Sequence, residues 1–151
     1  MIVAGIDPGS SGALCILDKD ITFYDFKKIG MLGYIKVLKD IKPEIVLVEK
    51  VHSMPRQGVS STFSFGQRLG EIEGILSTLS IPYELVSPQV WMKAIGIPAK
   101  SDKKQIASFI YKLYPNVELN GSKGGLLDGR SDSLCLAHYA RLKYIKETKW
   151  I

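Results

Sequence analysis

The hydrophobic and polar positions near the N-terminus predict three short strands. Residues 2–7 and 13–18 are apolar runs of the kind that forms buried strands, and a glycine-rich turn separates them. Lys19 and Asp20 then make a tight turn into residues 21–26, where polar and apolar positions alternate and predict one solvent-exposed face. The chain is therefore expected to open as an antiparallel meander.

Further along, helical spacing of the apolar positions alternates with buried runs. This spacing indicates a helix over residues 31–40, which ends before Pro43. The apolar run from Glu44 to Glu49 predicts a buried strand, parallel to the first because a helix crosses between them. The remaining segments are expected, in order, to form a loop (51–60), a long helix (61–79), a short strand (83–86), a short helix that starts at Ser87 and Pro88, a basic loop (96–100), a helix (101–114), a loosely structured segment (115–129) and a final helix from about Gly129 to Lys146. These elements predict an α/β fold with a five-stranded mixed sheet, antiparallel over its first three strands and parallel over the fourth and fifth, flanked by helices.

The apolar positions of the two longest helices predict the sides that pack inward. In the final helix, Leu134, Ala137 and Ala140 are expected to face the core. In the helix over residues 61–79, the core side is expected to carry Phe63, Phe65, Leu69, Ile72, Ile75 and Leu76. Both helices are therefore expected to cover the sheet with one apolar face.

Composition is typical of an ordinary soluble domain. The 151 residues, 46% of them hydrophobic, suffice for one domain, spanning 1–151, with a substantial core. No apolar run approaches the roughly 20 residues that cross a bilayer, so we expect a cytoplasmic protein without a membrane partner. Cys15 and Cys135 lie inside apolar patterns, which indicates reduced core thiols. The formal net charge of +5 mildly favours a polyanionic partner.

Two carboxylates stand at the ends of strands that are expected to be parallel neighbours. Asp7 ends the first strand and Glu49 ends the fourth, at the sheet edge where ligands of open α/β sheets bind. Two such charges about 4 Å apart repel by roughly 4 kcal/mol at an effective dielectric constant near 20. A divalent cation is a candidate to offset this repulsion. A surface ion pair between Glu49 and a cation such as Lys50 is the alternative.

The final helix offers two further acids. Asp128 and Asp132 are four residues apart, a spacing that places both on one helical face. An acid at a helix N-terminus is also explained by capping and by the helix dipole. Four such acids fit two-metal phosphodiester hydrolysis, in which the metals hold the attacking water and the leaving oxygen. A triad with histidine is disfavoured, because the chain has only His52 and His138 and the latter lies at an apolar helical position.

Five sequence stretches together resemble the RuvC-type Holliday junction resolvases, especially their short phage and prophage branch. In order, they are GIDPGSSGA, IVLVEKV, FGQRLGEIEGIL, LVSPQVWMKAIG and DGRSDSLCLAHYA, and the similarity runs from Ile2 to about Leu142. The resemblance implies an RNase H-like fold and a homodimer that binds branched DNA and needs no ATP. It also implies a crossover junction endodeoxyribonuclease, which makes paired symmetric nicks in a four-way DNA junction with Mg²⁺ or Mn²⁺, two ions per active site.

The family's four-acid site corresponds here to Asp7, Glu49, Asp128 and Asp132, which the resemblance implies as the metal ligands and catalytic residues. Asp132 matches the last aspartate of the family. The bacterial pattern places an acid three residues before that aspartate, a position that Gly129 occupies in this chain. Either the start of the helix absorbs one residue, or only three acids bind metal.

The resemblance also points to residues that contact DNA. Lys93 and Lys103 match lysines that contact phosphates near the scissile site, and Lys100 and Lys104 lie beside them in the sequence. His52 occupies the position of an aromatic residue that enters the junction centre in the bacterial enzymes. Candidate contacts also include Arg56, Arg68 and Arg130, and Met54 is a second candidate for the position at the junction centre. For each lysine alone, a solvated helix face is an equally good interpretation.

Three other functions remain open at this point. One is a RuvC-like nuclease with broader branched-DNA or RNA substrates, and another is a junction-binding module without catalysis. The third is an ATP-binding module like those of the actin and sugar-kinase superfamily, whose first phosphate loop also pairs a strand-end Asp with a glycine-rich turn. That superfamily needs two copies of the fold, and 151 residues hold only one.

Overall fold

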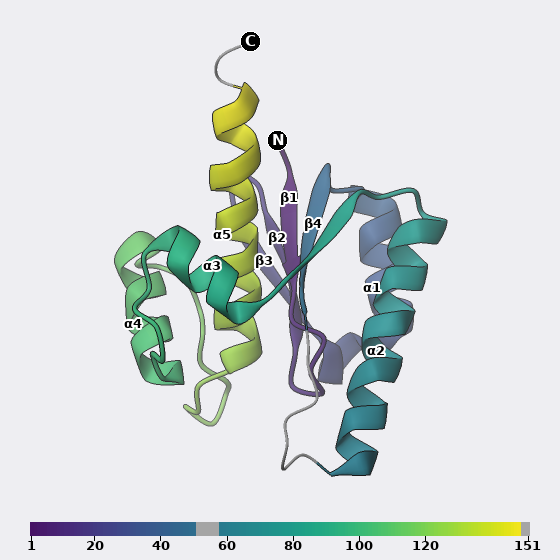
Figure 1. Ribbon diagram of the computed structural model, residues 1–151, viewed down its shortest axis with the longest axis horizontal. Coiled ribbons are helices and arrows are strands. Elements are labelled where there is room, and N and C mark those ends of the chain that lie inside the picture. The colour runs from purple at the N-terminus through teal and green to yellow at the C-terminus, as the bar shows by residue number, and fades with distance from the viewer. Residues whose placement is uncertain (51–57, 149–151) are drawn as a thin grey trace.

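A five-stranded sheet forms the centre of the computed structural model, which describes residues 1–50 and 58–148 (Figure 1). The strands are β1 (Val3–Ile6), β2 (Ala13–Leu17), β3 (Ile21–Asp25), β4 (Ile45–Glu49) and β5 (Tyr83–Val86). Their order across the sheet is β3-β2-β1-β4-β5. The first three strands pair antiparallel, and β4 pairs parallel with both β1 and β5. The predicted five-stranded mixed sheet is therefore confirmed.

Helices cover both faces of this sheet. They are α1 (Phe26–Ile41), α2 (Val59–Thr78), α3 (Pro88–Ile95), α4 (Lys103–Leu113) and α5 (Asp128–Thr148). Figure 1 shows α1 and α2 on one side of the strands and α3, α4 and α5 on the other. Alternate residues of each strand point to opposite faces of the sheet. Val3 therefore packs in the core on the α5 side, and Ala4 packs in the core on the side of α1 and α2. Among the described residues, no helix is long and apolar enough to span a membrane.

Helix α5 lies very close to β1. A Cβ atom added at Gly5 would overlap the carbonyl oxygen of Ser133 and stand 2.7 Å from the backbone nitrogen of Ala137. Glycine at this position therefore lets the two backbones approach. The buried residues of α5 include Leu134, Ala137 and Ala140, as their spacing predicts.

Two helices differ from their predicted form. Helix α1 begins at Phe26 rather than at residue 31. Gly30 (φ +63°) breaks it into a short first part, which the spacing did not predict, and a second part that contains the predicted helix over 31–40. In α2, Phe63 is 72% exposed, which contradicts its predicted place in the core. Figure 1 shows that the first turns of α2 extend past the end of the sheet, so the sheet offers no surface for Phe63 to cover. The buried residues of this helix are Ile72 and Leu76.

The segment before α5 is more ordered than predicted. Asn120 and Leu126 form an isolated antiparallel bridge. The amide of Gly121 donates to the carbonyl of Gly125 at 2.8 Å, and the amide of Leu127 donates to the carbonyl of Leu119 at 2.8 Å. These bonds close a turn beside the first residues of α5. Sequence composition, rich in glycine here, indicates the turn but not its pairing.

Candidate active site

Three carboxylates meet at the carboxyl end of the sheet. Asp7 directly follows β1, Glu49 is the last residue of β4, and Asp132 lies on the second turn of α5. One carboxylate oxygen from each residue lies within 4.8 Å of the other two. The parallel pairing of β1 with β4, in which Ile6 faces Val48, places the first two side by side. The close contact of α5 with β1 brings the third to them.

The glycine-rich turn after β1 holds the carboxylate of Asp7. The amide of Gly9 donates to Asp7 Oδ1 at 2.9 Å, and the amide of Gly12 donates to the carbonyl of Gly9 at 2.9 Å. A Cβ at Gly12 would overlap the carbonyl of Asp7, so this position requires glycine. Arg68 donates from Nε to the carbonyl of Pro8 at 3.0 Å. Hydrogen bonds within the turn and the bond from Arg68 therefore hold the turn in place. The carboxylate of Asp7 faces an open pocket.

Asp128 lies at the same pocket but has a different partner. Lys103 Nζ stands 2.9 Å from Asp128 Oδ2, so an ion pair occupies this carboxylate. A Cβ at Gly129 would overlap the carbonyl oxygen of Ser11, so no acidic side chain fits where the bacterial pattern expects one. Asp128, the first residue of α5, is therefore the position on this helix that can bring a fourth acid to the pocket. Within the described residues, the compact group of three oxygens consists of Asp7, Glu49 and Asp132 alone.

These side chains line a pocket of about 340 Å³. Its lining residues are Asp7, Gly9, Ser10, Ser11, Glu49, Phe65, Lys103, Asp128 and Asp132. Phe65 lines this pocket, although its spacing in the sequence predicts a core position. The spacing of Phe65 fits the apolar side of α2, and no sequence signal separates a core position from a pocket wall just beyond the sheet.

Burial controls the acid–base state of the three carboxyls. Removal from water raises the pKa of Asp7, of Glu49 and of Asp132 above ordinary values. Repulsion between neighbouring carboxylates raises the pKa of Glu49 and of Asp132 further. The hydrogen bond from Gly9 and the charge of Lys103 act in the opposite direction on Asp7. The cluster therefore favours protons, or another cation, over three unscreened negative charges.

The donor set fits a divalent cation of the hard type. Carboxylate oxygens are the ligands that Mg²⁺ and Mn²⁺ prefer in proteins. Asp7, Glu49 and Asp132 each offer an oxygen at the same place, and their raised pKa values show that compensating positive charge is needed there. These three residues are the ones that would hold such an ion.

The raised pKa values predict a stability effect that depends on both pH and metal. Because the folded carboxyls hold protons more tightly than unfolded ones, the metal-free protein loses stability as the pH rises above about 4, the ordinary carboxyl value. We expect Mg²⁺ to raise the melting temperature at pH 8 by about 3–6 °C relative to EDTA, and to do little at pH 5, where protons compete. Thermal scans of wild type and Glu49→Gln in both buffers measure this. An equal Mg²⁺ response at pH 5 and pH 8 would contradict the account.

Arg130 is used inside the protein and not as a free DNA contact. Its Nε and Nη2 donate to both oxygens of Asp25 at 2.9 and 2.8 Å, and its Nη1 donates to the carbonyl of Glu118 at 2.9 Å. The guanidinium also lies over the ring of Phe23, 5.2 Å from its centroid. Arg130 thereby ties the end of β3 and the 115–127 segment to the first turn of α5, between the two acids of that helix.

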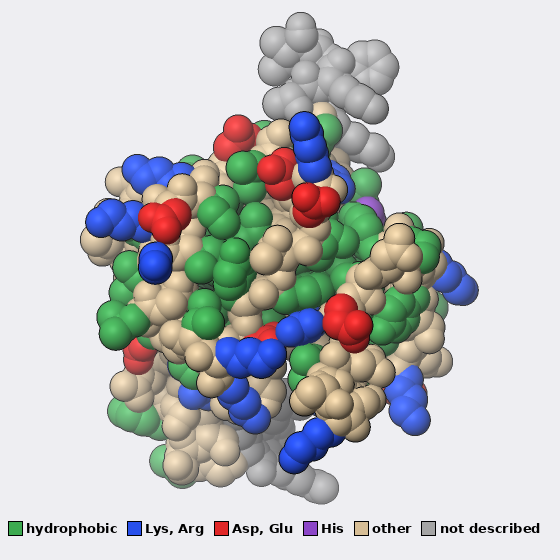
Figure 2. All heavy atoms as spheres, turned by 180° about the vertical axis from the view of Figure 1, so that it is seen from behind, with side chains coloured by type: hydrophobic (Ala, Val, Ile, Leu, Met, Phe, Trp, Pro, Cys, Tyr) green, Lys and Arg blue, Asp and Glu red, His purple; other side chains and the backbone are tan. Residues whose placement is uncertain are grey.

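The predicted DNA-binding residues do not all reach this pocket. Lys103 lines it, whereas Lys93 and Lys100 line a separate groove between α3 and the following loop. Lys104 lines a third hollow on α4. Figure 2 shows several Lys and Arg side chains close together near the middle of one face of the molecule. His52, Met54 and Arg56 lie outside the described residues.

The chain is similar in structure to solved Holliday junction resolvases. RuvC of Thermus thermophilus matches with a TM-score of 0.65 at 20% identity, over 95% of this chain and 97% of that one. The T. thermophilus RuvC complex with a Holliday junction substrate gives 0.66 at 21% identity, over 94% and 96%. The fowlpox virus resolvase, in a complex with substrate Holliday junction DNA, gives 0.60 at 21% identity, over 98% and 99%. No protein-family model and no curated protein sequence matches the chain. The predicted RNase H-like architecture is thereby confirmed, and the chain has the fold of the RuvC-type resolvases.

Proposed function

We propose that this protein is a divalent-metal-dependent endonuclease that resolves four-way DNA junctions by paired symmetric nicks. The observation that carries the proposal is the meeting of Asp7, Glu49 and Asp132 at one pocket, in a chain that shares its fold with two solved junction resolvases. We infer Mg²⁺ or Mn²⁺ as the metal, with two ions per site. When bound, these ions would activate water and stabilise the charge that develops at the scissile phosphate.

The chain's own residues have distinct parts in this proposal. Asp7, Glu49 and Asp132 hold the cations, and the glycine-rich turn keeps the space in front of Asp7 free of side chains. Lys103 brings a positive charge to the pocket, where it both pairs with Asp128 and attracts a phosphate. If a bound phosphate replaces Asp128 as the ion-pair partner of Lys103, the carboxylate of Asp128 becomes free to act as a further metal ligand.

Several basic residues and one histidine supply the proposed DNA contacts. Phosphate contacts position a nucleic acid and give an affinity that falls with salt, with a slope of about −0.9 per neutralised phosphate. The net charge of +5 supports such binding. Beside Lys103, the proposed contacts are Lys93, Lys100, Lys104, Arg56 and His52.

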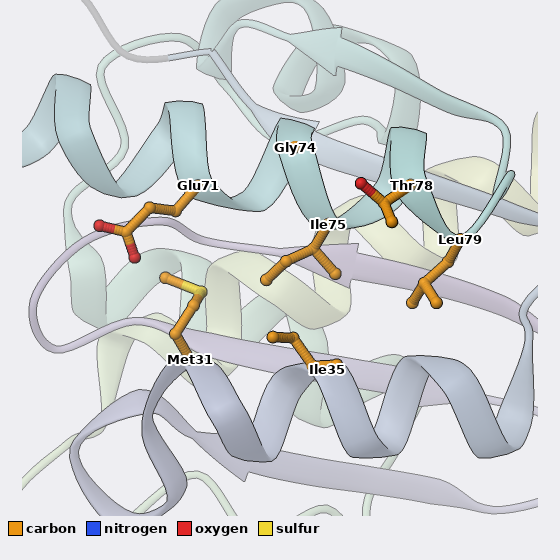
Figure 3. A pocket seen from close by; sticks show the side chains of 7 residues that line it. All are labelled: Met31, Ile35, Glu71, Gly74, Ile75, Thr78 and Leu79. Carbon is orange, nitrogen blue, oxygen red and sulfur yellow. The ribbon is translucent and has the colours of Figure 1, made fainter.

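Paired symmetric nicks need two active sites, so we propose a homodimer. Helix α2 carries a stripe that no other described residue covers, in which Val59 is 88% and Phe63 is 72% exposed. Along the same stripe, a Cβ added at Gly66, Gly70 or Gly74 would meet no atom within 4 Å. Gly74 also borders an apolar pocket of about 380 Å³ between α1 and α2, where Met31 and Ile35 face Ile75 and Leu79 (Figure 3). A second copy of α2 fits this stripe, because small residues allow close helix packing.

A charge in this stripe is expected to separate the dimer. Phe63→Glu places a carboxylate where the partner helix would pack, so we expect the molar mass in solution to fall from dimer to monomer. Light scattering after gel filtration measures this mass. Leu113→Glu, on α4 at a side chain that is 42% exposed, is the matched control and should stay dimeric. A monomeric wild type, or a dimeric Phe63→Glu, would contradict the proposed interface.

Cleavage of a synthetic four-way junction tests the proposed function. The junction and a linear duplex of the same sequence are offered separately and in competition, in Mg²⁺ and in Mn²⁺. We expect paired nicks on the junction alone and no cleavage in EDTA. Equal cutting of the linear duplex would overturn the proposal, and equal competition by forked DNA or RNA would favour the broader-substrate alternative.

The alternatives without nuclease chemistry are not favoured. T. thermophilus RuvC and the fowlpox virus resolvase share this fold over at least 94% of the chain, and both are junction resolvases. A junction-binding module without catalysis has no need for three carboxylates buried together. Protection of the protein by ATP in a thermal scan would revive the ATP-binding alternative.

A further inference from the structure

A second pocket adjoins the acidic one. It has a volume of about 310 Å³ and shares two wall residues, Ser11 and Asp128, with the acidic pocket. The glycine-rich turn, the start of α1 and the turn before α5 surround it. Its lining residues are Ser11, Gly12, Asp25, Lys27, Lys28, Gly121, Ser122, Leu126, Leu127 and Asp128. The two pockets are therefore neighbours, on either side of these shared residues.

The second pocket has an excess of positive charge once the ion-pair partners of its acids are counted, because its lining itself holds two lysines and two aspartates. Both oxygens of its Asp25 accept hydrogen bonds from Arg130, and its Asp128 is paired with Lys103. The negative charges of these two acids are thus offset within the protein. Lys27 and Lys28 add two further positive charges; the latter is 73% exposed on its side chain and 3.6 Å from Asp25 Oδ2. An anion in this pocket would meet more positive than negative charge.

The rest of the lining suits a sugar–phosphate backbone. Gly12 and Gly121 leave the pocket walls without side chains, and Ser11 and Ser122 bring hydroxyl groups that can bond to phosphate oxygens. Leu126 supplies an apolar surface for a deoxyribose ring. The lysines and hydroxyl groups suit the phosphates of a DNA strand, and the apolar surface of Leu126 suits the sugar between them.

We propose that the pocket lined by Lys27 and Lys28 binds a non-scissile phosphate of the strand whose neighbouring phosphate lies at the three carboxylates. This inference rests on the proposed nuclease function and adds a binding subsite to it. The groove that contains Lys93 and Lys100 shares no lining residue with this pocket, so the new contact is separate from those two predicted contacts. A strand anchored here is held in register over the acids, whose own charge would otherwise repel it.

The test compares two double variants of α1. Lys27→Ala/Lys28→Ala removes the proposed contacts, whereas Lys36→Ala/Lys39→Ala removes the same charge from exposed positions that line neither pocket. Binding of the synthetic junction is measured in EDTA by fluorescence anisotropy, over a range of salt concentrations. We expect the first variant to bind roughly tenfold more weakly, with a salt slope shallower by about 1 to 2. The second variant should match wild type. The single variant Lys27→Ala keeps the ion pairs of Asp25 with Lys28 and Arg130, so weaker binding by this variant is not caused by their loss.

Neutral phosphates locate the contact on the DNA. Methylphosphonates are placed one at a time beside the nick position, and one of them should weaken binding by wild type and not by Lys27→Ala/Lys28→Ala. Identical affinity and salt slope for the two double variants would overturn the subsite. The comparison of the two double variants in EDTA needs no cleavage, so failure of the subsite is distinguishable from failure of the nuclease proposal, which fails if wild type cuts junction and duplex equally.

Discussion

Replacement of Asp7 by Asn is expected to lower the rate of junction nicking by about 10³-fold or more, while junction binding persists or tightens. Asparagine keeps the shape of the side chain, and its oxygen can still accept the hydrogen bond from the amide of Gly9. It lacks the negative charge that a divalent cation needs, so the cluster with Glu49 and Asp132 loses one of its three anionic ligands. Removal of that charge also lessens the repulsion of DNA. Single-turnover nicking and anisotropy measure the two effects separately.

Substitutions of two other aspartates serve as controls for Asp7→Asn. Asp40→Asn, on an exposed position of α1, should nick like wild type. Asp128→Asn should lose less activity than Asp7→Asn, because its carboxylate is already paired with Lys103 outside the three-oxygen group. Nicking by Asp7→Asn at the wild-type rate would show that the reaction does not use this pocket.

Gly5→Ala is expected to lower the free energy of unfolding by about 3 kcal/mol or more. The new Cβ would overlap the carbonyl oxygen of Ser133 and lie 2.8 Å from Leu136 Cβ, so α5 has to move away from β1. Backbone cannot rotate aside as a flexible side chain can. Urea denaturation followed by circular dichroism measures the change in free energy.

The matched control for this substitution is Gly125→Ala. A Cβ at Gly125 meets no atom within 4 Å, and the residue has no positive φ, so we expect a change within about 0.5 kcal/mol. If Gly5→Ala unfolds at the same urea concentration as Gly125→Ala, the close packing of α5 on β1 is wrong. The position of Asp132 at the carboxylate cluster would then also lose its structural basis.

The sheet and the two strand-end acids were predictable because each depends on local pattern and one topological rule. Short apolar runs identify β1, β2 and β4, and the helix that crosses before β4 predicts that β4 is parallel to β1. The register of this pair, with Ile6 opposite Val48, places Asp7 beside Glu49. The helical spacing of the apolar residues in α5 then indicates the side on which Asp132 lies.

Features that depend on distant packing were not predictable. Arg130 and Asp25 are 105 positions apart, and neither has a local signal for the other. The amphipathic spacing of α2 gives its apolar side but not the point where the sheet ends, so Phe63 was wrongly placed in the core. The need for glycine at position 129, where the bacterial pattern has an acid, follows from the approach of the Ser11 carbonyl, which only the folded structure shows.

Metal binding by the carboxylate cluster is the central claim, and calorimetric titration tests it most directly. Mn²⁺ is titrated into wild type and into Glu49→Gln at pH 7, in buffers of different ionisation enthalpy, so that proton release is counted together with binding. Because the folded carboxyls have raised pKa values, we predict saturable binding with release of protons by wild type, and at least about tenfold weaker binding by the variant. Equal affinity and equal proton release in the two proteins would contradict a metal site formed by Asp7, Glu49 and Asp132.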